Sequence, residues 1–314
     1  MLVNLVPEFL AATRAPDPVN AYRQYLETHR PILSSYWHNY ILDLDSPHVD
    51  EVVRRVVQAD YRDLRDLMER EKIDGVTEDM MARCEDTYGI DWPYDVYLMV
   101  GVGGANAGEL VVDGRGIAFI CLEHFTGRPN HETLGLGLMP DQIGVWLAHE
   151  IAHLVRYTSP KSRAELATVV EDAGGSYDCW DAGSRVTLLE LLVNEGLAVA
   201  GSRLLAPDFE PWEYLGYTRR QYQRLRQLEA FLFHELRSEF LARGLGYRLR
   251  YLTGGVPATQ RIVAGKVVPE RAGYYVGDRL AEGMVTELGI GPALRESAES
   301  VLPFGQQDTD IQSA

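Results

Sequence analysis

The stretch Asp141-Gln-Ile-Gly-Val-Trp-Leu-Ala-His149-Glu150-Ile-Ala-His153-Leu-Val-Arg156 decides how the rest of the chain is interpreted. The spacing of its apolar residues predicts a helix that is buried on most sides and begins near Pro140. On such a helix His149 and His153 lie on one face, about 6 Å apart along the axis. Two imidazoles so placed can share one zinc ion, and Glu150, one residue round the helix, can reach a water molecule beside that ion.

A match of five residues can arise by chance. The plain alternative is an ordinary helix with two core histidines and a solvated glutamate. However, three ionisable side chains in an otherwise apolar helix are costly to bury unless something pairs them. A divalent cation would pair them, and the pattern therefore favours a metal site.

The composition is that of a globular protein with ample core, because 46% of the 314 residues are hydrophobic and 24% are charged. The net charge of −16 disfavours nucleic acid and membrane surfaces as partners, since both require a basic surface. The sequence contains no basic leader and no apolar run long enough to cross a membrane. Three widely spaced cysteines are typical of free thiols, and a cytoplasmic protein is predicted.

The two halves of the chain differ in character. Residues 1–90 form a helical N-terminal region in which Pro47–Glu71 is expected to be one long amphipathic helix. The β-rich runs Tyr94–Val100 and Gly116–Cys121, with a further short strand at Glu109–Val112, predict a small antiparallel or mixed sheet beside the metal helix. The edge strand of this sheet is expected to be available for pairing with an extended substrate backbone.

A glycine-rich segment follows the first of these strands. Gly101-Val-Gly103 is similar to the start of a dinucleotide-binding fingerprint, but Asn106 occupies the sixth position and a strand follows instead of a helix. Nucleotide binding is therefore disfavoured.

A catalytic zinc site needs a third protein ligand, and a second apolar helix offers candidates. Ser184–Ser202 is strongly apolar and carries Glu190 and Glu195. Glu195 is the natural ligand, because the small residues Gly196 and Ala198 beside it would let this helix approach the first one closely. Glu190 is the fallback, and the plain alternative is that Glu195 points to solvent.

His149-Glu150-x-x-His153 followed by Asn194-Glu195-x-x-Ala198 resembles the gluzincin metallopeptidases. The spacer of forty-one residues between His153 and Glu195 contains a polar insertion. The Glu195-Gly-Leu-Ala198 sequence and this long spacer make the chain similar to uncharacterised bacterial families of predicted zinc-dependent proteases. The resemblance covers roughly residues 92–288.

A further match to those families lies downstream. Gly273-Tyr274-Tyr275-Val-Gly277 is similar to their Gly-Tyr-x-x-Gly segment, which opens a C-terminal helix. The resemblance implies that Tyr274 faces the active site and hydrogen-bonds the developing oxyanion, a role that a phenol can fill. Tyr275 is the alternative, and either tyrosine can instead belong to the core.

Other potential ligands are weaker. His124 and His131 lie between the last strand and the metal helix, where histidines are usually solvated. Cys179 has no second cysteine or histidine at zinc spacing.

The predicted fold is α+β and mostly helical. It comprises the helical region 1–90, a zincin-like (gluzincin) catalytic domain at 91–303 with its small sheet beside the metal helix, and a polar tail at 304–314.

The predicted function is that of a zinc-dependent hydrolase, most plausibly a metallopeptidase that acts on a peptide or protein. His149, His153 and Glu195 would hold one zinc ion per chain, Glu150 would be the general base, and Tyr274 would stabilise the oxyanion. One alternative is a zinc-bound binding or regulatory module, which the presence of Glu150 disfavours. Another is a non-peptide amidase that uses the same site.

Overall fold

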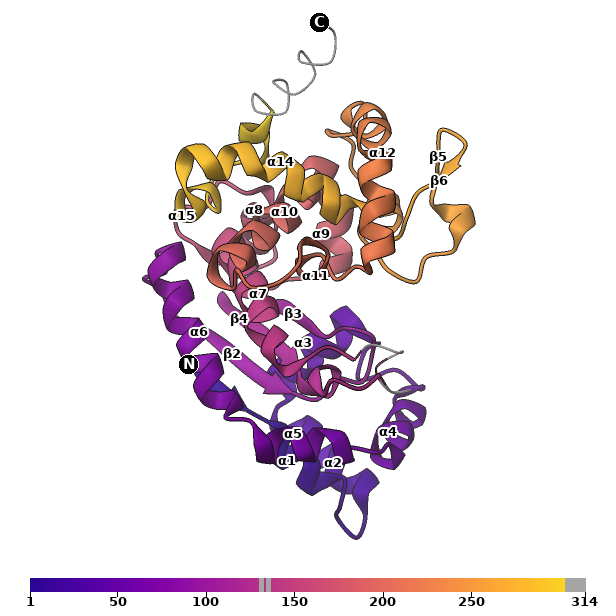
Figure 1. Ribbon diagram of the computed structural model, residues 1–314. Helices are drawn as coiled ribbons and strands as arrows, with labels where there is room; N and C mark the ends of the chain where they lie inside the picture. The colour runs from indigo at the N-terminus through magenta and orange to yellow at the C-terminus, as the bar shows by residue number, and fades with distance from the viewer. Residues whose placement is uncertain (130–132, 134–136, 303–314) are drawn as a thin grey trace, which may run out of the picture.

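A small mixed sheet and one buried helix lie in the middle of a mostly helical chain (Figure 1). The computed structural model describes residues 1–129, 133 and 137–302. The expectation of a mostly helical α+β protein is confirmed. None of the described helices combines the length and the apolar character that a membrane span requires.

The sheet has the strand order β1-β2-β4-β3, with β1 (Leu2–Asn4), β2 (Tyr94–Met99), β3 (Ala107–Val112) and β4 (Arg115–Cys121). β1, β2 and β4 are parallel, whereas β3 is antiparallel to β4. The turn between β3 and β4 is the expected hairpin, in which Asp113 and Gly114 both have positive φ. β1 is not predicted by the sequence pattern, and its pairing with β2 makes Leu2–Asn4 part of the same sheet.

Six helices follow β1 in the N-terminal region: α1 (Val6–Ala12), α2 (Pro18–Thr28), α3 (Arg30–Tyr40), α4 (Val49–Gln58), α5 (Arg62–Arg70) and α6 (Ile73–Tyr88). The prediction of one helix over Pro47–Glu71 is wrong, because the chain is extended at Ala59 and begins a new helix after Tyr61. The Asp60 carboxylate accepts a hydrogen bond from the backbone N–H of Arg62, and this local contact competes with helix continuation.

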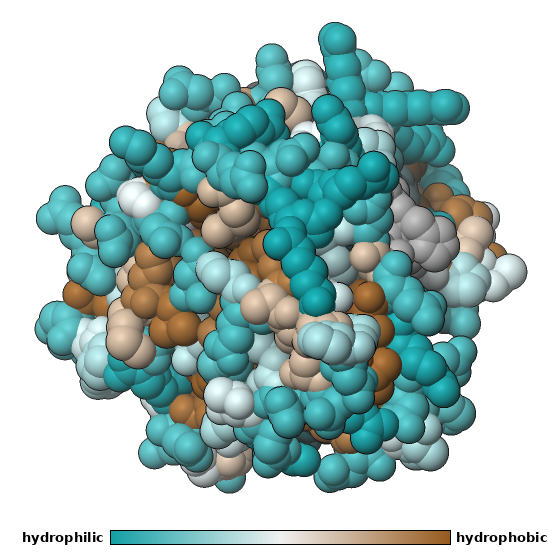
Figure 2. All heavy atoms as spheres, turned by 90° about the horizontal axis from the view of Figure 1, so that it is seen from below, coloured by the Kyte–Doolittle hydropathy of each residue, from teal (hydrophilic) through white to brown (hydrophobic). Residues whose placement is uncertain are grey.

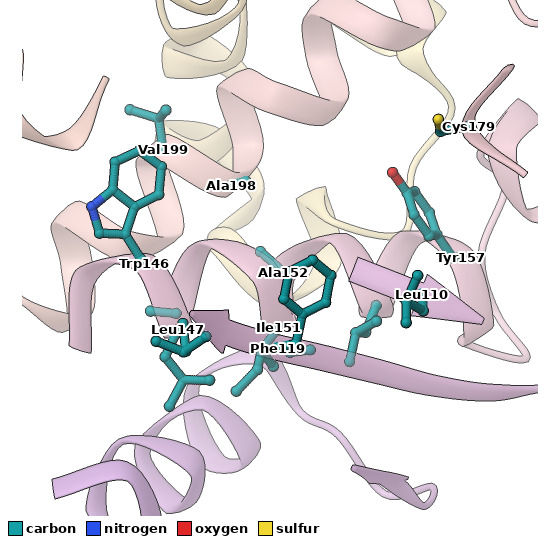
Figure 3. Close-up of a cluster of buried hydrophobic side chains, with 14 of the residues drawn as sticks. Leu110, Phe119, Trp146, Leu147, Ile151, Ala152, Tyr157, Cys179, Ala198 and Val199 are labelled. Carbon is teal, nitrogen blue, oxygen red and sulfur yellow. The ribbon is translucent and has the colours of Figure 1, made fainter. Parts of the chain in front are cut away.

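The predicted metal helix is α7 (Ile143–Thr158), preceded by the 3-10 turn η2 (Pro140–Gln142). All of its residues except Thr158 are buried. Leu147 and Ile151 pack on the sheet side with Phe119, while Trp146 points toward Val199 on the neighbouring helix (Figure 3). Contact with elements on several sides explains why its apolar residues follow no single stripe.

The remaining elements follow in chain order: η1 (Leu122–Phe125), α8 (Glu165–Asp172), α9 (Cys179–Arg185), α10 (Leu188–Leu205), α11 (Pro211–Tyr214), α12 (Arg219–Arg237), α13 (Leu245–Tyr251), η3 (Ala258–Gln260), β5 (Ile262–Val263), β6 (Lys266–Val267), α14 (Ala272–Leu288), α15 (Ile290–Ala293) and η4 (Ala298–Val301). β5 and β6 form a separate antiparallel pair. In Figure 1, α10 lies between α7 and α14.

Glycines allow α10 and α14 to approach closely. A Cβ added at Gly277 would lie 1.9 Å from the carbonyl oxygen of Leu192, and one added at Gly196 would lie 2.0 Å from that of Gly277. Gly196 was expected to face the metal helix, but it contacts α14 on the opposite side of α10. The two glycines of the sequence motifs therefore fix helix packing.

The surface agrees with the acidic, charged composition. On the face shown in Figure 2, hydrophilic side chains cover most of the surface and apolar ones occur between them in small groups. The large exposed apolar residues are distributed over many elements, and such scattering is normal for a globular protein. The three cysteines are free and buried, as expected.

Candidate metal centre

α7 and α10 bring His149, His153 and Glu195 together. The two histidines lie one turn apart on α7 and are each 3% exposed. The Oε2 atom of Glu195 is 3.2 Å from Nε2 of His149 and 3.6 Å from Nε2 of His153. The structure thus places the predicted third residue against the predicted pair.

The geometry of these donor atoms fits a zinc ion. Ligands held tetrahedrally at 2.0–2.1 Å from zinc lie about 3.3 Å from one another. The two measured separations bracket that value, and one ligand atom from each of the three residues lies within 4.8 Å of the others. Two imidazoles and a carboxylate are also a donor set of catalytic zinc sites.

Aromatic packing holds the two imidazole rings in place. The His149 ring lies 5.7 Å from the Trp146 ring and 6.4 Å from the nearly parallel Tyr274 ring. The His153 ring lies parallel to Tyr157 at 6.0 Å. Within the described part of the chain, neither Nδ1 atom has a hydrogen-bond partner. Ring orientation here therefore depends on stacking, where many metal sites use a second hydrogen bond.

The electrostatics of the three residues favour a bound cation. Burial alone would raise the pKa of Glu195, but the two imidazoles hold it well below its usual range. Burial lowers the pKa of His149. At His153 burial also acts to lower the pKa, but Glu195 and two further carboxyl groups outweigh it and raise the pKa to about 9. A proton on His153 and a metal ion would compete for the same place.

Glu150 lies beside the triad and faces a second carboxyl group. Its side chain is buried, and its pKa is raised well above the usual range, first by burial and then by the charge of Glu109 on β3. A carboxyl group that is buried beside another one is harder to ionise, because the two charges repel. Glu109, Glu150 and His153 form a second group of potential ligands. The triad suits a metal better, since its carboxylate is already ionised between two imidazoles.

Glu109 is a site residue that the sequence analysis missed. Its oxygens accept hydrogen bonds from the hydroxyl of Tyr157 at 3.0 Å and from that of Tyr40 at 3.4 Å. Asn194, next to Glu195 on α10, donates in turn to the Tyr157 hydroxyl at 3.1 Å. The available signal was a lone acidic residue in an apolar strand that leads, through a hairpin, back toward the metal helix.

The outer edge of β3 is already occupied at its centre. The backbone N–H of Glu109 donates to the Tyr40 hydroxyl, whose one proton is shared between the carbonyl and the carboxylate of Glu109. The Val111 carbonyl accepts from the backbone N–H of Tyr177. The expectation that this edge is free to pair with a substrate backbone is therefore wrong at these two residues, because the chain's own groups use the hydrogen bonds.

The two tyrosines at the start of α14 have different surroundings. Tyr274 stacks beside His149, and burial raises its pKa, so that its hydroxyl keeps its proton at neutral pH. Tyr275 is 2% exposed and donates a hydrogen bond to Glu229 on α12. Of the two, Tyr274 is the one beside the triad.

The other candidates lie elsewhere. Glu190, the fallback ligand, forms an ion pair with Arg156 at 2.5 Å, and both side chains are completely buried. His124 was expected to be solvated but is completely buried, and burial lowers its pKa to about 4. The Cys179 thiol donates to the backbone carbonyl of Asn39. His131 lies outside the described residues.

Comparisons of the chain with protein-family models, with curated proteins and with solved structures gave no match. The case for a function therefore rests on the geometry of the site.

Proposed function

We propose that the protein is a zinc-dependent hydrolase, a metallopeptidase of the gluzincin type. The observation that carries the proposal is the convergence of His149, His153 and Glu195 at distances that suit zinc, with Glu150 alongside them. A purely structural zinc would need no buried carboxyl group next to it. The presence of Glu150 therefore favours a hydrolase over a zinc-bound binding module.

The chain's own residues would divide the work of amide hydrolysis. When bound, a zinc ion would supply Lewis acidity to a water molecule and to the substrate carbonyl. In its ionised form, which a cation on the triad would favour, Glu150 would take the proton from the attacking water and deliver it to the leaving amine. Glu109, which two tyrosine hydroxyls hold in place, would orient the Glu150 carboxyl. The Tyr274 hydroxyl would donate a hydrogen bond to the oxyanion.

The test combines metal content with peptide cleavage. Purified protein should carry about one zinc per chain by elemental analysis, because the triad supplies one set of ligands. Glu150→Gln should keep the metal and lose at least about a hundredfold in the cleavage rate of a peptide library. The matched control is Glu171→Gln, the same change on the exposed face of α8.

Two results would contradict the proposal. One is protein that carries no zinc after gentle purification and takes up none on titration. The other is undiminished cleavage by Glu150→Gln. Cleavage of acylated amines but of no peptide would shift the assignment to a non-peptide amidase with the same site.

A further inference from the structure

Arg271 lies beside the candidate metal centre, at the start of α14. Its guanidinium carbon is 4.0 Å from the centre of the Tyr274 ring, and that ring is nearly parallel to the ring of His149. Among the described residues no carboxylate forms an ion pair with this guanidinium. A half-buried arginine without such a partner has unused hydrogen-bonding capacity.

Three other arginines have defined hydrogen-bonding partners. Arg156 forms a buried ion pair with Glu190, and Arg203 pairs with Asp278. Arg248 donates to the backbone carbonyl of Cys179. Compared with these, the Arg271 guanidinium lies beside the triad over an aromatic ring, and no carboxylate of the described residues is in direct contact with it.

The backbone around Arg271 is arranged to keep the side chain where it is. Arg271 has a φ of 56°, a left-handed conformation that is unfavourable for a residue with a side chain. The Tyr217 hydroxyl donates to its carbonyl at 2.6 Å. A Cβ added at Gly216 would lie 2.9 Å from the Arg271 guanidinium and 3.1 Å from the Trp146 ring. A strained backbone and a glycine-lined space both serve the position of this one side chain.

We propose that Arg271 binds a carboxylate of the substrate, either the free C-terminus of a peptide or an acidic side chain near the scissile bond. The proposal rests on the proposed function. With a divalent cation on the triad, the guanidinium would face a second positive charge, so this wall would attract an anion. The planar fork of a guanidinium matches the two oxygens of a carboxylate.

Binding without turnover tests the proposal directly. The probes are N-acetyl-leucine, its C-terminal amide, and N-acetyl-glutamate α-amide, titrated into the zinc-loaded Glu150→Gln protein by calorimetry. The first or the third probe should bind about tenfold or more tightly than the leucine amide, because an ionic hydrogen bond is gained. Which of the two binds distinguishes a terminal from a side-chain carboxylate.

Substitution of Arg271 separates its contribution from direct binding of a carboxylate to zinc. In Arg271→Met the preference for the acid should fall to within about twofold, whereas Arg271→Lys should keep part of it, since lysine retains the charge without the fork. Both replacements keep a side chain at the same strained φ. The matched control is Arg219→Met. Arg219, at the start of α12, also lies over an aromatic ring, that of Trp212.

Equal binding of acid and amide, or no binding of either, would overturn the proposal. A preference that survives Arg271→Met would also overturn it. If the zinc-loaded protein cleaves peptides with a C-terminal carboxylate and peptides with a C-terminal amide at equal rates, then Arg271 does not bind the terminal carboxylate. The hydrolase assignment would stand in that case. Conversely, an Arg271-dependent preference without any hydrolysis would support the carboxylate site and count against the hydrolase.

Discussion

Glu190 and Glu195 lie on the same helix and both reach toward α7, yet their partners differ completely. Glu190 faces Arg156, which also donates to the backbone carbonyls of Leu294 and Glu296, and neither side chain is exposed. Glu195 faces two imidazoles and keeps a small exposed fraction. A guanidinium is always charged, so Glu190 keeps its ion-pair partner Arg156 at any ordinary pH. Imidazoles can exchange a proton for a metal, so the second group can take a ligand.

The largest effect should come from breaking the ion pair of Glu190 and Arg156. Glu190→Gln leaves Arg156 buried without a counter-charge, and the free energy of unfolding of the metal-free protein should fall by about 3–5 kcal/mol. Urea denaturation in the presence of a chelator measures the change. The control, Asp172→Asn, breaks the exposed pair with Arg185 and should cost under about 1 kcal/mol. Similar losses in both variants would mean that the buried pair is not special.

The same substitution at Glu195 should lower zinc affinity and have little effect on folding. Glu195→Gln removes an ionised donor from the triad, and zinc affinity should fall by more than the roughly 10–100-fold that loss of an outer-shell partner costs. Competition titration with a chromophoric chelator measures this. Metal-free Glu195→Gln should stay folded, because each imidazole can adopt the neutral form. Unchanged zinc affinity would move the third ligand elsewhere and end the contrast with Glu190.

The contrast also depends on the fixed position of α10. Gly277→Ala places a methyl group against the Leu192 carbonyl and should lower the free energy of unfolding by about 1–3 kcal/mol by pushing α14 away. Tyr274 and Arg271 would move with α14. Gly246→Ala is the control, because nothing lies within 4 Å of its added methyl group. Thermal denaturation compares the two, and equal melting temperatures would show that the close approach is unimportant.

Local sequence patterns predicted where the two histidines lie but did not predict the residues that surround them. Periodicity and the four-residue spacing predicted α7 and the positions of His149 and His153 on one face. Glu195 was preferred over Glu190 because of its small neighbours, but Gly196 contacts α14, and what separates the two glutamates is Arg156, a partner of Glu190 from another element. β1 was missed because its pairing with β2 joins residues far apart in the chain. The role of Glu109 was missed because its partners Tyr40 and Tyr157 come from two distant helices. The break at Asp60 depends on one side-chain hydrogen bond that competes with the helix.

The smallest change in stability is expected from an exposed histidine that contacts two carboxylates. Comparison with the buried triad tests how much burial contributes. His38 on α3 lies 2.6 Å from Asp43 and 3.1 Å from Asp178, which caps α9, and hydrogen bonds to these carboxylates raise its pKa. Because the folded state binds the proton more tightly, the contribution to stability is full below the unfolded pKa near 6.5 and disappears as the pH rises through the raised folded value. The difference in unfolding free energy between wild type and His38→Gln should therefore shrink as the pH rises from about 5 to 9, and solvent screening should keep it under about 1 kcal/mol. If the difference in unfolding free energy grew with pH, His38 would be neutral in the folded protein. The aspartates would then hold it by hydrogen bonds to a neutral ring, unlike the ionised contact between Glu195 and His153.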